Sequence, residues 1–389
     1  MEASLYVHVP FCAGGKCDYC DFYSVPVNSA AGHSAAEERF APFIDTLLAG
    51  AEGLFAAFPP EKIPSVYIGG GTPSVLGPHG ISRLLTGLLR LTGRFSPPPE
   101  EVTVEANPES ADEAFLAAAR EAGASRLSLG VQSFHRRSRE AVHRIGADSN
   151  EALLHERLSL AAKYFPGAFS ADLLSGLPFQ NEKIIACDID ALLSHKPAHV
   201  SLYALTIEDG TALAGQKAGA SFQLPEGDEA DALWLCGRDL LEKEGYSQYE
   251  VSNFCLAGKE SIHNIRYWRM ENWLALGPSA SGTIIDDEKG TGLRYVIPRE
   301  STTIKADGAF EALDAATLIK ETILMGFRYI NGPDEDLFRR RFKTGIENII
   351  PKTLNSWRSL LQYNKPALSK DGLLLLNRFL LDAFDELMK

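Results

Sequence analysis

The stretch Cys12-Ala13-Gly14-Gly15-Lys16-Cys17-Asp18-Tyr19-Cys20 puts three cysteines within nine residues near the start of a chain of 389 residues. Structural zinc sites and simple iron–sulfur carriers use four protein ligands, whereas the next cysteine here is Cys187. A cluster held by three thiolates keeps one coordination position open, as chemistry at an iron requires. Gly14 and Gly15 give the backbone the freedom that lets the thiolates converge. The stretch therefore predicts an iron site with an open position.

Two other interpretations of this stretch stay open. Its spacing, C-x4-C-x2-C, resembles the first part of the plant-type ferredoxin pattern, which needs one further cysteine to complete its cluster. The three cysteines can also be free thiols in a tight loop. The first of these alternatives predicts a plain iron–sulfur electron carrier.

The composition is that of an acidic globular protein, with 45% hydrophobic residues and a formal net charge of -13. An acidic chain without a basic run argues against nucleic acid as a main partner. The first residues lack the basic and apolar regions of a signal peptide, and no apolar run approaches the length of a spanning helix, so we expect no membrane anchor. The six cysteines are unevenly spaced, which disfavours a disulfide framework. These features predict a cytoplasmic location.

Short apolar runs alternate with longer amphipathic stretches over the first two-thirds of the chain, which is the pattern of repeated βα units. The expected strands are Leu5–Val9, Ser65–Ile68, Val102–Ala106, Arg126–Gly130, Ser170–Leu174 and His199–Ala204. The expected helices are Ala36–Phe55, Ile81–Leu91, Ala111–Ala122, Asn150–Tyr164, Lys183–Leu193 and Asp228–Lys243. Six strands with intervening helices predict a parallel sheet, either open and doubly wound or closed into a partial barrel.

Polar or otherwise unusual residues recur near the carboxyl ends of all six expected strands. They are the cysteine stretch, the run Gly69-Gly70-Gly71-Thr72-Pro73, Glu105, Gln132, Asp172 and Tyr203. A β/α barrel gathers its catalytic groups at that face from several strands, whereas an open sheet concentrates them at one switch point. We therefore predict an α/β fold with a partial (β/α)6 barrel over residues 1–248.

The chain is longer than one hydrophobic core normally supports, and the alternation ends near Tyr249. Residues 249–308, rich in glycine and polar side chains, are expected to be a connecting segment. Residues 309–389 are expected to form a small, mainly helical, winged-helix-like domain. Its expected elements are helices over Ala309–Phe327, Leu354–Tyr363 and Leu374–Leu387, with a turn at Ser369-Lys370-Asp371-Gly372.

Two motifs carry chemistry only in combination. The glycine run leaves backbone that can approach a ligand closely, but such turns are commonly structural, and no nucleotide-binding fingerprint accompanies this one. Glu105 lies among apolar strand residues, where a carboxylate needs a partner. That partner is either an amine on a ligand or an internal arginine. Gln132, Arg144 and Asp172 can likewise be either ligand contacts or internal polar partners. They indicate a binding site only if they lie together around the opening of the barrel.

Together these residues resemble the radical S-adenosylmethionine superfamily, in the branch of oxygen-independent coproporphyrinogen III oxidase and the HemW-type heme chaperones. The resemblance covers nearly the whole chain. It is carried by Tyr6-Val7-His8-Val9-Pro10-Phe11-Cys12, Gly69–Ser74, Glu105-Ala106-Asn107-Pro108, Leu129-Gly130-Val131-Gln132-Ser133-Phe134, Asp172-Leu173-Leu174-Ser175-Gly176-Leu177-Pro178 and Ser201-Leu202-Tyr203-Ala204-Leu205.

The resemblance implies a 4Fe-4S cluster on Cys12, Cys17 and Cys20, with S-adenosylmethionine chelating the fourth iron. It implies that the following residues contact this ligand: Tyr6, Tyr19, Gly70, Gly71, Thr72, Glu105, Gln132, Arg144, Asp172 and Ala204. One feature departs from the family, because the usual loop is C-x3-C-x2-C and this one has an extra residue between Cys12 and Cys17. We expect Gly14-Gly15 to let that residue bulge outward.

Three features favour the chaperone over the oxidase. The oxidase has a further cysteine one residue after its third, whereas Asp21-Phe22 follow Cys20 here. Eleven residues precede Cys12, which leaves out the N-terminal segment that helps the oxidase to hold its substrate. His263-Asn264-Ile265-Arg266-Tyr267-Trp268 resembles the H-N-x-x-Y-W heme-binding motif of the chaperones.

The motif predicts a heme site on His263, Tyr267 and Trp268. Imidazole is a natural ligand of heme iron, and the two aromatic rings can stack on a flat macrocycle. Cys255 is a weaker candidate for the iron ligand. The leading hypothesis is a heme chaperone that delivers heme to acceptor proteins, which are expected at the membrane. The alternative is an enzyme, a coproporphyrinogen dehydrogenase that uses a deoxyadenosyl radical, while the electron carrier would bind no S-adenosylmethionine.

Overall fold

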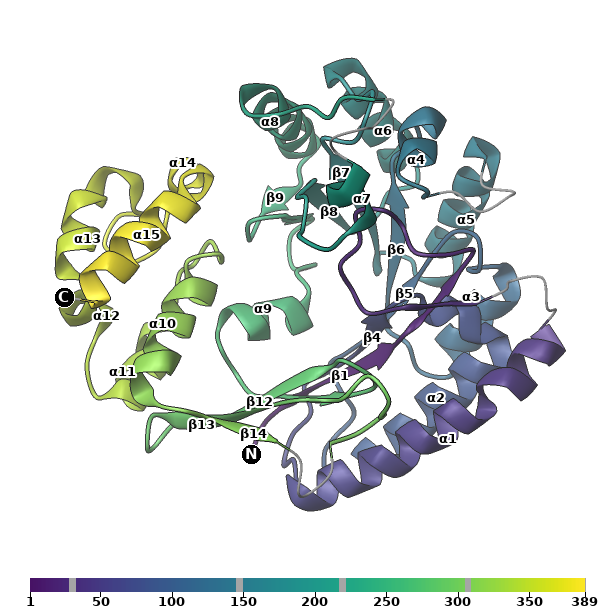
Figure 1. Ribbon diagram of the computed structural model, residues 1–389, viewed down its shortest axis with the longest axis horizontal. Coiled ribbons are helices and arrows are strands. Elements are labelled where there is room, and N and C mark those ends of the chain that lie inside the picture. The colour runs from purple at the N-terminus through teal and green to yellow at the C-terminus, as the bar shows by residue number, and fades with distance from the viewer. Residues whose placement is uncertain (28–32, 145–149, 217–221, 305–308, 389) are drawn as a thin grey trace.

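A computed structural model describes residues 1–27, 33–144, 150–216, 222–304 and 309–388 (Figure 1). Six parallel strands lie next to one another in chain order. They are β1 (Ser4–Val9), β4 (Ser65–Gly70), β5 (Glu101–Ala106), β6 (Arg126–Gln132), β7 (Phe169–Ser175) and β8 (His199–Ala204). All six predicted strands are thereby confirmed, and the parallel order agrees with the predicted α/β fold.

Helices follow the strands and cover the outer face of this sheet (Figure 1). They are α1 (His33–Ala57), α2 (Gly77–Thr92), α3 (Glu113–Glu121), α4 (Arg136–Ala141), α5 (Glu151–Tyr164), α6 (Glu182–Leu193) and α8 (Asp228–Lys243), with the 3-10 turn η1 (Pro73–Leu76). The short helix α7 (Ala212–Gln216) lies instead beside the cysteine loop, where Leu213 N donates to the Asp18 carbonyl oxygen. Asp112, Asn150 and Asn181 each accept a hydrogen bond from a backbone N–H three residues ahead. These N-caps set where α3, α5 and α6 begin.

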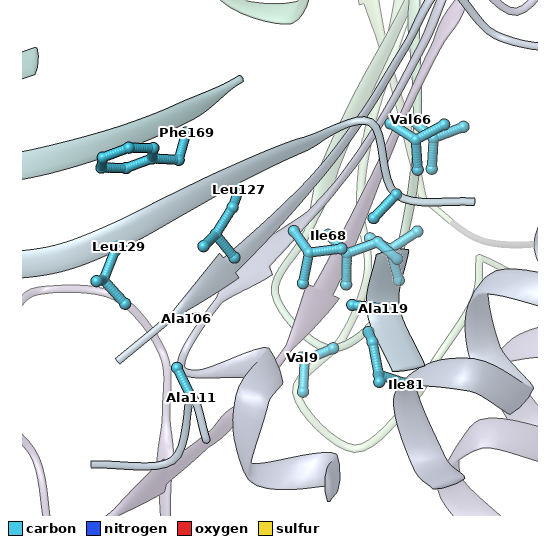
Figure 2. Close-up of a cluster of buried hydrophobic side chains, with 14 of the residues drawn as sticks. Val9, Val66, Ile68, Ile81, Ala106, Ala111, Ala119, Leu127, Leu129 and Phe169 are labelled. Carbon is cyan, nitrogen blue, oxygen red and sulfur yellow. The ribbon is translucent and has the colours of Figure 1, made fainter. Parts of the chain in front are cut away.

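Residues along the strands alternate between a face toward the helices and a face toward the barrel interior, except for an irregularity between Gly130 and Gln132 of β6. Val66 and Ile68 of β4 pack outward with Ile81 of α2, as Figure 2 shows. The intervening residues Tyr67 and Gly69 point inward, where polar groups gather. The alternation places Glu105 of β5 on the same interior side as Tyr67.

The sheet continues beyond the barrel, and the sequence did not predict this part. β11 (Trp273–Leu276) pairs parallel with β1, and β12 (Ser281–Asp286), β13 (Thr291–Val296) and β14 (Phe310–Leu313) follow in antiparallel order. At the other edge, β10 (Asn253–Cys255) and β9 (Ser247–Gln248) extend from β8. Residues 249–304 therefore contribute four strands to the sheet, β10, β11, β12 and β13. These strands contain glycines such as Gly282, which Tyr295 covers closely, and glycine is typical of loops. The sequence pattern of the segment therefore indicated a loop.

The C-terminal region is helical, as predicted, and has a hydrophobic cluster of its own around Phe327, Phe338, Trp357 and Phe379. Its elements are α10 (Ala315–Gly326), α11 (Glu335–Phe342), α12 (Ile346–Ile349), α13 (Pro351–Ser356), η2 (Arg358–Leu360), α14 (Lys370–Leu374) and α15 (Leu376–Leu387). The domain limits and the winged-helix likeness stay predictions.

Three local predictions for this region were wrong. The stretch Ala309–Phe327 begins with strand β14, and helix α10 starts only after Asp314, whose carboxylate caps it. The helix expected over Leu354–Tyr363 is α13 followed by η2. The expected turn at Ser369–Gly372 starts α14, because Ser369 Oγ accepts a hydrogen bond from Gly372 N and so nucleates a helical turn.

By length and composition, Glu38–Ala57 of α1 could cross a membrane. A helix that packs in a protein core passes the same test, and the expectation of no membrane anchor stays a prediction. Phe40, Ile44, Leu47 and Leu54 of this helix are buried in the main hydrophobic cluster. The apolar face of α1 thus contributes to the core beside the sheet.

Candidate functional site

A cavity of about 400 Å³ lies at the carboxyl ends of the barrel strands. It brings together eleven of the predicted site residues: Cys12, Cys17, Tyr19, Cys20, Gly70, Gly71, Thr72, Glu105, Gln132, Arg144 and Asp172. These residues come from segments up to about 160 positions apart in sequence. The polar residues at the strand ends therefore do meet around one mouth.

The cysteine loop depends on its two glycines. Gly14 and Gly15 have φ values of 73° and 115°, in the left-handed region that favours glycine. The three thiols line one cavity, and no group of three or more His, Cys, Asp or Glu among the described residues forms a site for a single metal ion. A cubane cluster does not need such a site, because each thiolate binds a different iron. Burial raises the pKa of the Cys20 thiol to about 11, so iron must displace its proton.

Asn107 connects two of the cysteines, a role that was not predicted. Its Nδ2 donates to Thr72 Oγ1 at 2.9 Å, and Thr72 Oγ1 in turn donates to Cys12 Sγ at 3.6 Å. Its Oδ1 accepts from Arg144 at 2.7 Å, and Arg144 donates to Cys17 Sγ at 3.8 Å. Asn107 belongs to the Glu105-Ala106-Asn107-Pro108 motif, which was noted in the sequence. Its hydrogen-bond partners, Thr72 and Arg144, are known only from the fold.

Each glycine of the run after β4 is required by a close neighbour. A Cβ on Gly69 would lie 2.7 Å from Glu105, and one on Gly71 would lie 2.7 Å from the Phe11 carbonyl oxygen. Gly70 has a φ of 105° and lies against His8. The run thereby forms a side-chain-free wall of the cavity.

Glu105 is held by hydrogen bonds, and the charge of Arg126 acts on it only from beyond ion-pair distance. Tyr67 Oη donates to Oε1 at 2.6 Å and Gly70 N donates to Oε2 at 3.1 Å. Among the described residues Glu105 forms no ion pair, so the internal arginine proposed as its partner is not in contact with it. Burial raises the pKa of this carboxyl to about 7, and the nearby Asp172 adds to the effect. An ammonium group on a ligand in the cavity would relieve this cost.

Two of the residues expected at this ligand lie outside the cavity lining. Tyr6 is inside the barrel, where its ring stacks on Tyr67 and its hydroxyl contacts His8 Nδ1 at 3.1 Å. Ala204 is exposed at the end of β8, and Tyr203 lines the cavity in its place.

The three residues of the expected heme motif lie on α9 (Ile262–Trp268), at the other end of the barrel. His263 Nδ1 is 2.9 Å from the Oγ of Ser65, the first residue of β4, whereas Gly70 at the end of β4 lines the cavity. At the rise of a β-strand these two ends are about 16 Å apart. The predicted residues thus divide into two separate sites.

His263 is buried, with 2% of its surface exposed. Its ring stacks on Tyr67 with centroids 4.9 Å apart and meets Tyr267 edge-on at 4.9 Å. Burial lowers its pKa to about 3, so the imidazole is neutral. Among the described residues its Nε2 has no hydrogen-bond partner, and the same holds for the indole nitrogen of Trp268.

Comparison with known proteins identifies the class. The sequence profile of the Radical SAM superfamily matches residues 6–187. The chain is 32% identical to the heme chaperone HemW of Lactococcus lactis, over 89% of this chain and 86% of that protein. It is 33% identical to the heme chaperone HemW of Escherichia coli, over 72% of this chain and 70% of that protein.

One solved structure shares the whole fold. Coproporphyrinogen III oxidase (HemN) from Escherichia coli superposes with a TM-score of 0.75 at 19% identity, over 98% of this chain and 89% of that one. The chain therefore belongs to the radical SAM superfamily, in the HemW family, and shares its fold with coproporphyrinogen III oxidase.

Membership implies a 4Fe-4S cluster and S-adenosylmethionine, and the cavity fits both. Three thiols line it, so a four-iron cluster held by them would have one iron without a protein ligand. Glu105 provides an acceptor that is in no ion pair among the described residues, and the glycine wall leaves room beside it. The sequence alone identified these groups, but it did not separate them from the motif on α9.

Proposed function

We propose that this protein is a heme carrier of the HemW type, which binds heme and delivers it to acceptor proteins. The observation that carries the proposal is His263 on α9. A buried, neutral imidazole with an unpartnered Nε2 is the form of histidine that ligates a metal. When Nδ1 donates its proton to Ser65 Oγ, the Nε2 lone pair is free for iron.

Heme must reach this nitrogen through a local rearrangement, because His263 is buried. Tyr267 and Trp268 are only partly buried and flank it on the same short helix. Moving α9 outward would bring all three side chains to the surface together. We propose that the porphyrin ring then packs on these two rings while His263 binds the iron.

In this proposal the cavity residues hold the other two groups. Cys12, Cys17 and Cys20 bind the 4Fe-4S cluster, which supplies redox chemistry when bound. Glu105 and the glycine wall receive the ammonium and carboxylate of S-adenosylmethionine, and Tyr19, Gln132, Arg144 and Asp172 line the remainder. Tyr6 and Ala204 do not line the cavity. Tyr6 lies inside the barrel below this ligand, and Ala204 lies at the end of β8 beside it.

An oxidative decarboxylase of coproporphyrinogen III is the second candidate, since the fold is shared with that enzyme. Phe22 stands where the oxidase has its extra cysteine, and 60% of its surface is exposed at the cavity edge. This difference favours the carrier. A cytoplasmic site of action and membrane-associated acceptors are part of the same proposal.

Heme titration of the purified protein tests the role of His263. Anaerobically reconstituted wild type should bind one heme per chain with the absorption spectrum of a histidine ligand, and His263→Ala should lose that spectrum. His199→Ala is the matched control, because His199 is equally buried but both its nitrogens are hydrogen-bonded, to Ser170 and Tyr249. Cys255→Ser should bind heme like wild type. Equal affinity and equal spectra for His263→Ala and wild type would refute the proposed ligand.

A further inference from the structure

We infer that Tyr67 is a positioning residue that couples Glu105 in the cavity to His263 on α9. Tyr67 lies in the middle of β4, between the two sites. Its hydroxyl is bonded to Glu105 and its ring faces His263. The inference rests on the proposed function, because it concerns how the cofactor end of the barrel influences the heme end.

The contacts of Tyr67 reach both sites through one rigid side chain. The hydroxyl donates to Glu105 Oε1 at 2.6 Å, which lies in the usual range for a charge-assisted O–H donor to a carboxylate. The ring stacks on His263 at 4.9 Å with an interplanar angle of 28°, and on Tyr6 at 6.2 Å with an angle of 30°. A strand residue enclosed on two sides cannot move at one contact without shifting the other.

The charge on Glu105 depends on this hydroxyl. The groups that face the carboxyl are Asp172 of β7, which raises its pKa, and Arg126 of β6, the Gly70 N–H and Tyr67, which lower it. Burial opposes ionisation most strongly. Tyr67 therefore favours the ionised form of Glu105, which a cationic ligand needs, and its ring transmits any displacement of the carboxylate to the imidazole.

Tyr67→Phe removes the hydroxyl and keeps the ring. Calorimetric titration of S-adenosylmethionine against pH should show that the midpoint of binding moves up by about one pH unit in Tyr67→Phe. Tyr246→Phe is the matched control, since Tyr246 is also buried and donates to a backbone carbonyl, that of Pro197. A midpoint that stays at the wild-type value in Tyr67→Phe overturns the inference.

Infrared titration of the carboxyl band separates this inference from the proposed function. Glu105→Gln identifies the band, and its titration midpoint should rise in Tyr67→Phe without any ligand present. If wild type bound no S-adenosylmethionine, the proposed cofactor site would fail, yet this titration would still decide what Tyr67 does to Glu105. An unshifted band would contradict the positioning role even where the ligand binds.

The second half of the inference concerns His263. S-adenosylmethionine should change the heme dissociation constant of wild type by about fivefold or more. Heme should change the dissociation constant of S-adenosylmethionine by the same factor. Tyr67→Phe should bind heme with the wild-type spectrum, but S-adenosylmethionine should change its heme dissociation constant by a smaller factor. An equal change in wild type and in Tyr67→Phe would overturn the coupling.

Discussion

At the scale of single residues, the cavity is organised by groups that hold one another across strands. Asn107 of the β5–α3 connection joins the Cys12 side of the loop to the Cys17 side through Thr72 and Arg144. Such residues act on a metal by orienting its ligands. Asn107, Thr72 and Arg144 would thus orient two of the thiols that hold the cluster, without binding iron themselves.

Asn107→Ala should therefore weaken retention of the cluster. The expected loss, about 10- to 100-fold in affinity for the metal site, is typical when a partner of a metal ligand is removed. Iron content after mild chelation measures it. Asn181→Ala, which removes the N-cap of α6, is the control for general destabilisation. Equal iron retention in both variants would contradict the role of Asn107.

Glu105→Gln should alter the pH dependence of stability. The pKa of Glu105 in the folded protein, about 7, is above its unfolded value. Its stabilising contribution is present below pH 4 to 5 and is lost as pH rises through 7. Glutamine has no such loss, so the variant should gain up to about 2 kcal/mol on wild type between pH 5 and pH 8, reduced by solvent in the cavity.

Denaturant unfolding at both pH values measures this difference. Glu113→Gln is the control of opposite sign, because the hydrogen bonds from Lys163 and Tyr164 lower the pKa of that carboxyl. A difference between Glu105→Gln and wild type that does not vary with pH would show that Glu105 is ionised without cost.

The sequence predicted single residues well where the signal was local. Cys12, Cys17, Cys20 and Glu105 follow strands directly, so the alternation of strands and helices placed them at one mouth. Asn107 and Tyr67 were not predicted, because what they do depends on partners from neighbouring strands.

At the scale of elements, the first turn of α9 is attached to the barrel by one carboxylate. Glu101 at the start of β5 accepts hydrogen bonds from Ser261 Oγ, Ile262 N and His263 N. A carboxylate at a helix N-terminus is favourable for the helix dipole as well as for its free N–H groups. Glu101 thereby holds His263 in its buried position.

Glu101→Gln should loosen α9, since it removes the charge and at least one acceptor. We expect a loss of about 1–3 kcal/mol in the local stability of α9 and faster heme association. Hydrogen exchange at α9 measures the first and stopped-flow absorption the second. Asp112→Asn alters the cap of α3 in a similar way and should change neither. Unaltered exchange in Glu101→Gln would mean that other contacts hold α9.

The elements that the sequence predicted have local causes, such as the N-caps of α3, α5 and α6. Strands β11 to β14 were missed because glycines and turns interrupt their apolar pattern. Their pairing with β1 and with one another depends on residues far away in the chain. Helix α10 was predicted too long for the same reason, because pairing with β13 makes its first part a strand.

At the scale of the whole molecule, the barrel has different chemistry at its two ends. The cysteine cavity lies at the carboxyl ends of the strands, and α9 lies against the beginning of β4. Figure 1 shows α9 between the barrel and the C-terminal helices. Arg269, just after α9, pairs with Asp334 at the start of α11. The C-terminal region is thus attached next to the helix that carries His263.

The central claim is that a radical SAM barrel here carries heme and does not oxidise a porphyrinogen. Anaerobic incubation of the cluster-loaded protein with coproporphyrinogen III, a reductant and S-adenosylmethionine tests it most directly, with chromatography of the porphyrins. Coproporphyrinogen III oxidase assayed in parallel shows that the conditions support turnover. We predict that the coproporphyrinogen remains unchanged while the same preparation binds one heme per chain. Formation of protoporphyrinogen at catalytic rates would contradict the claim.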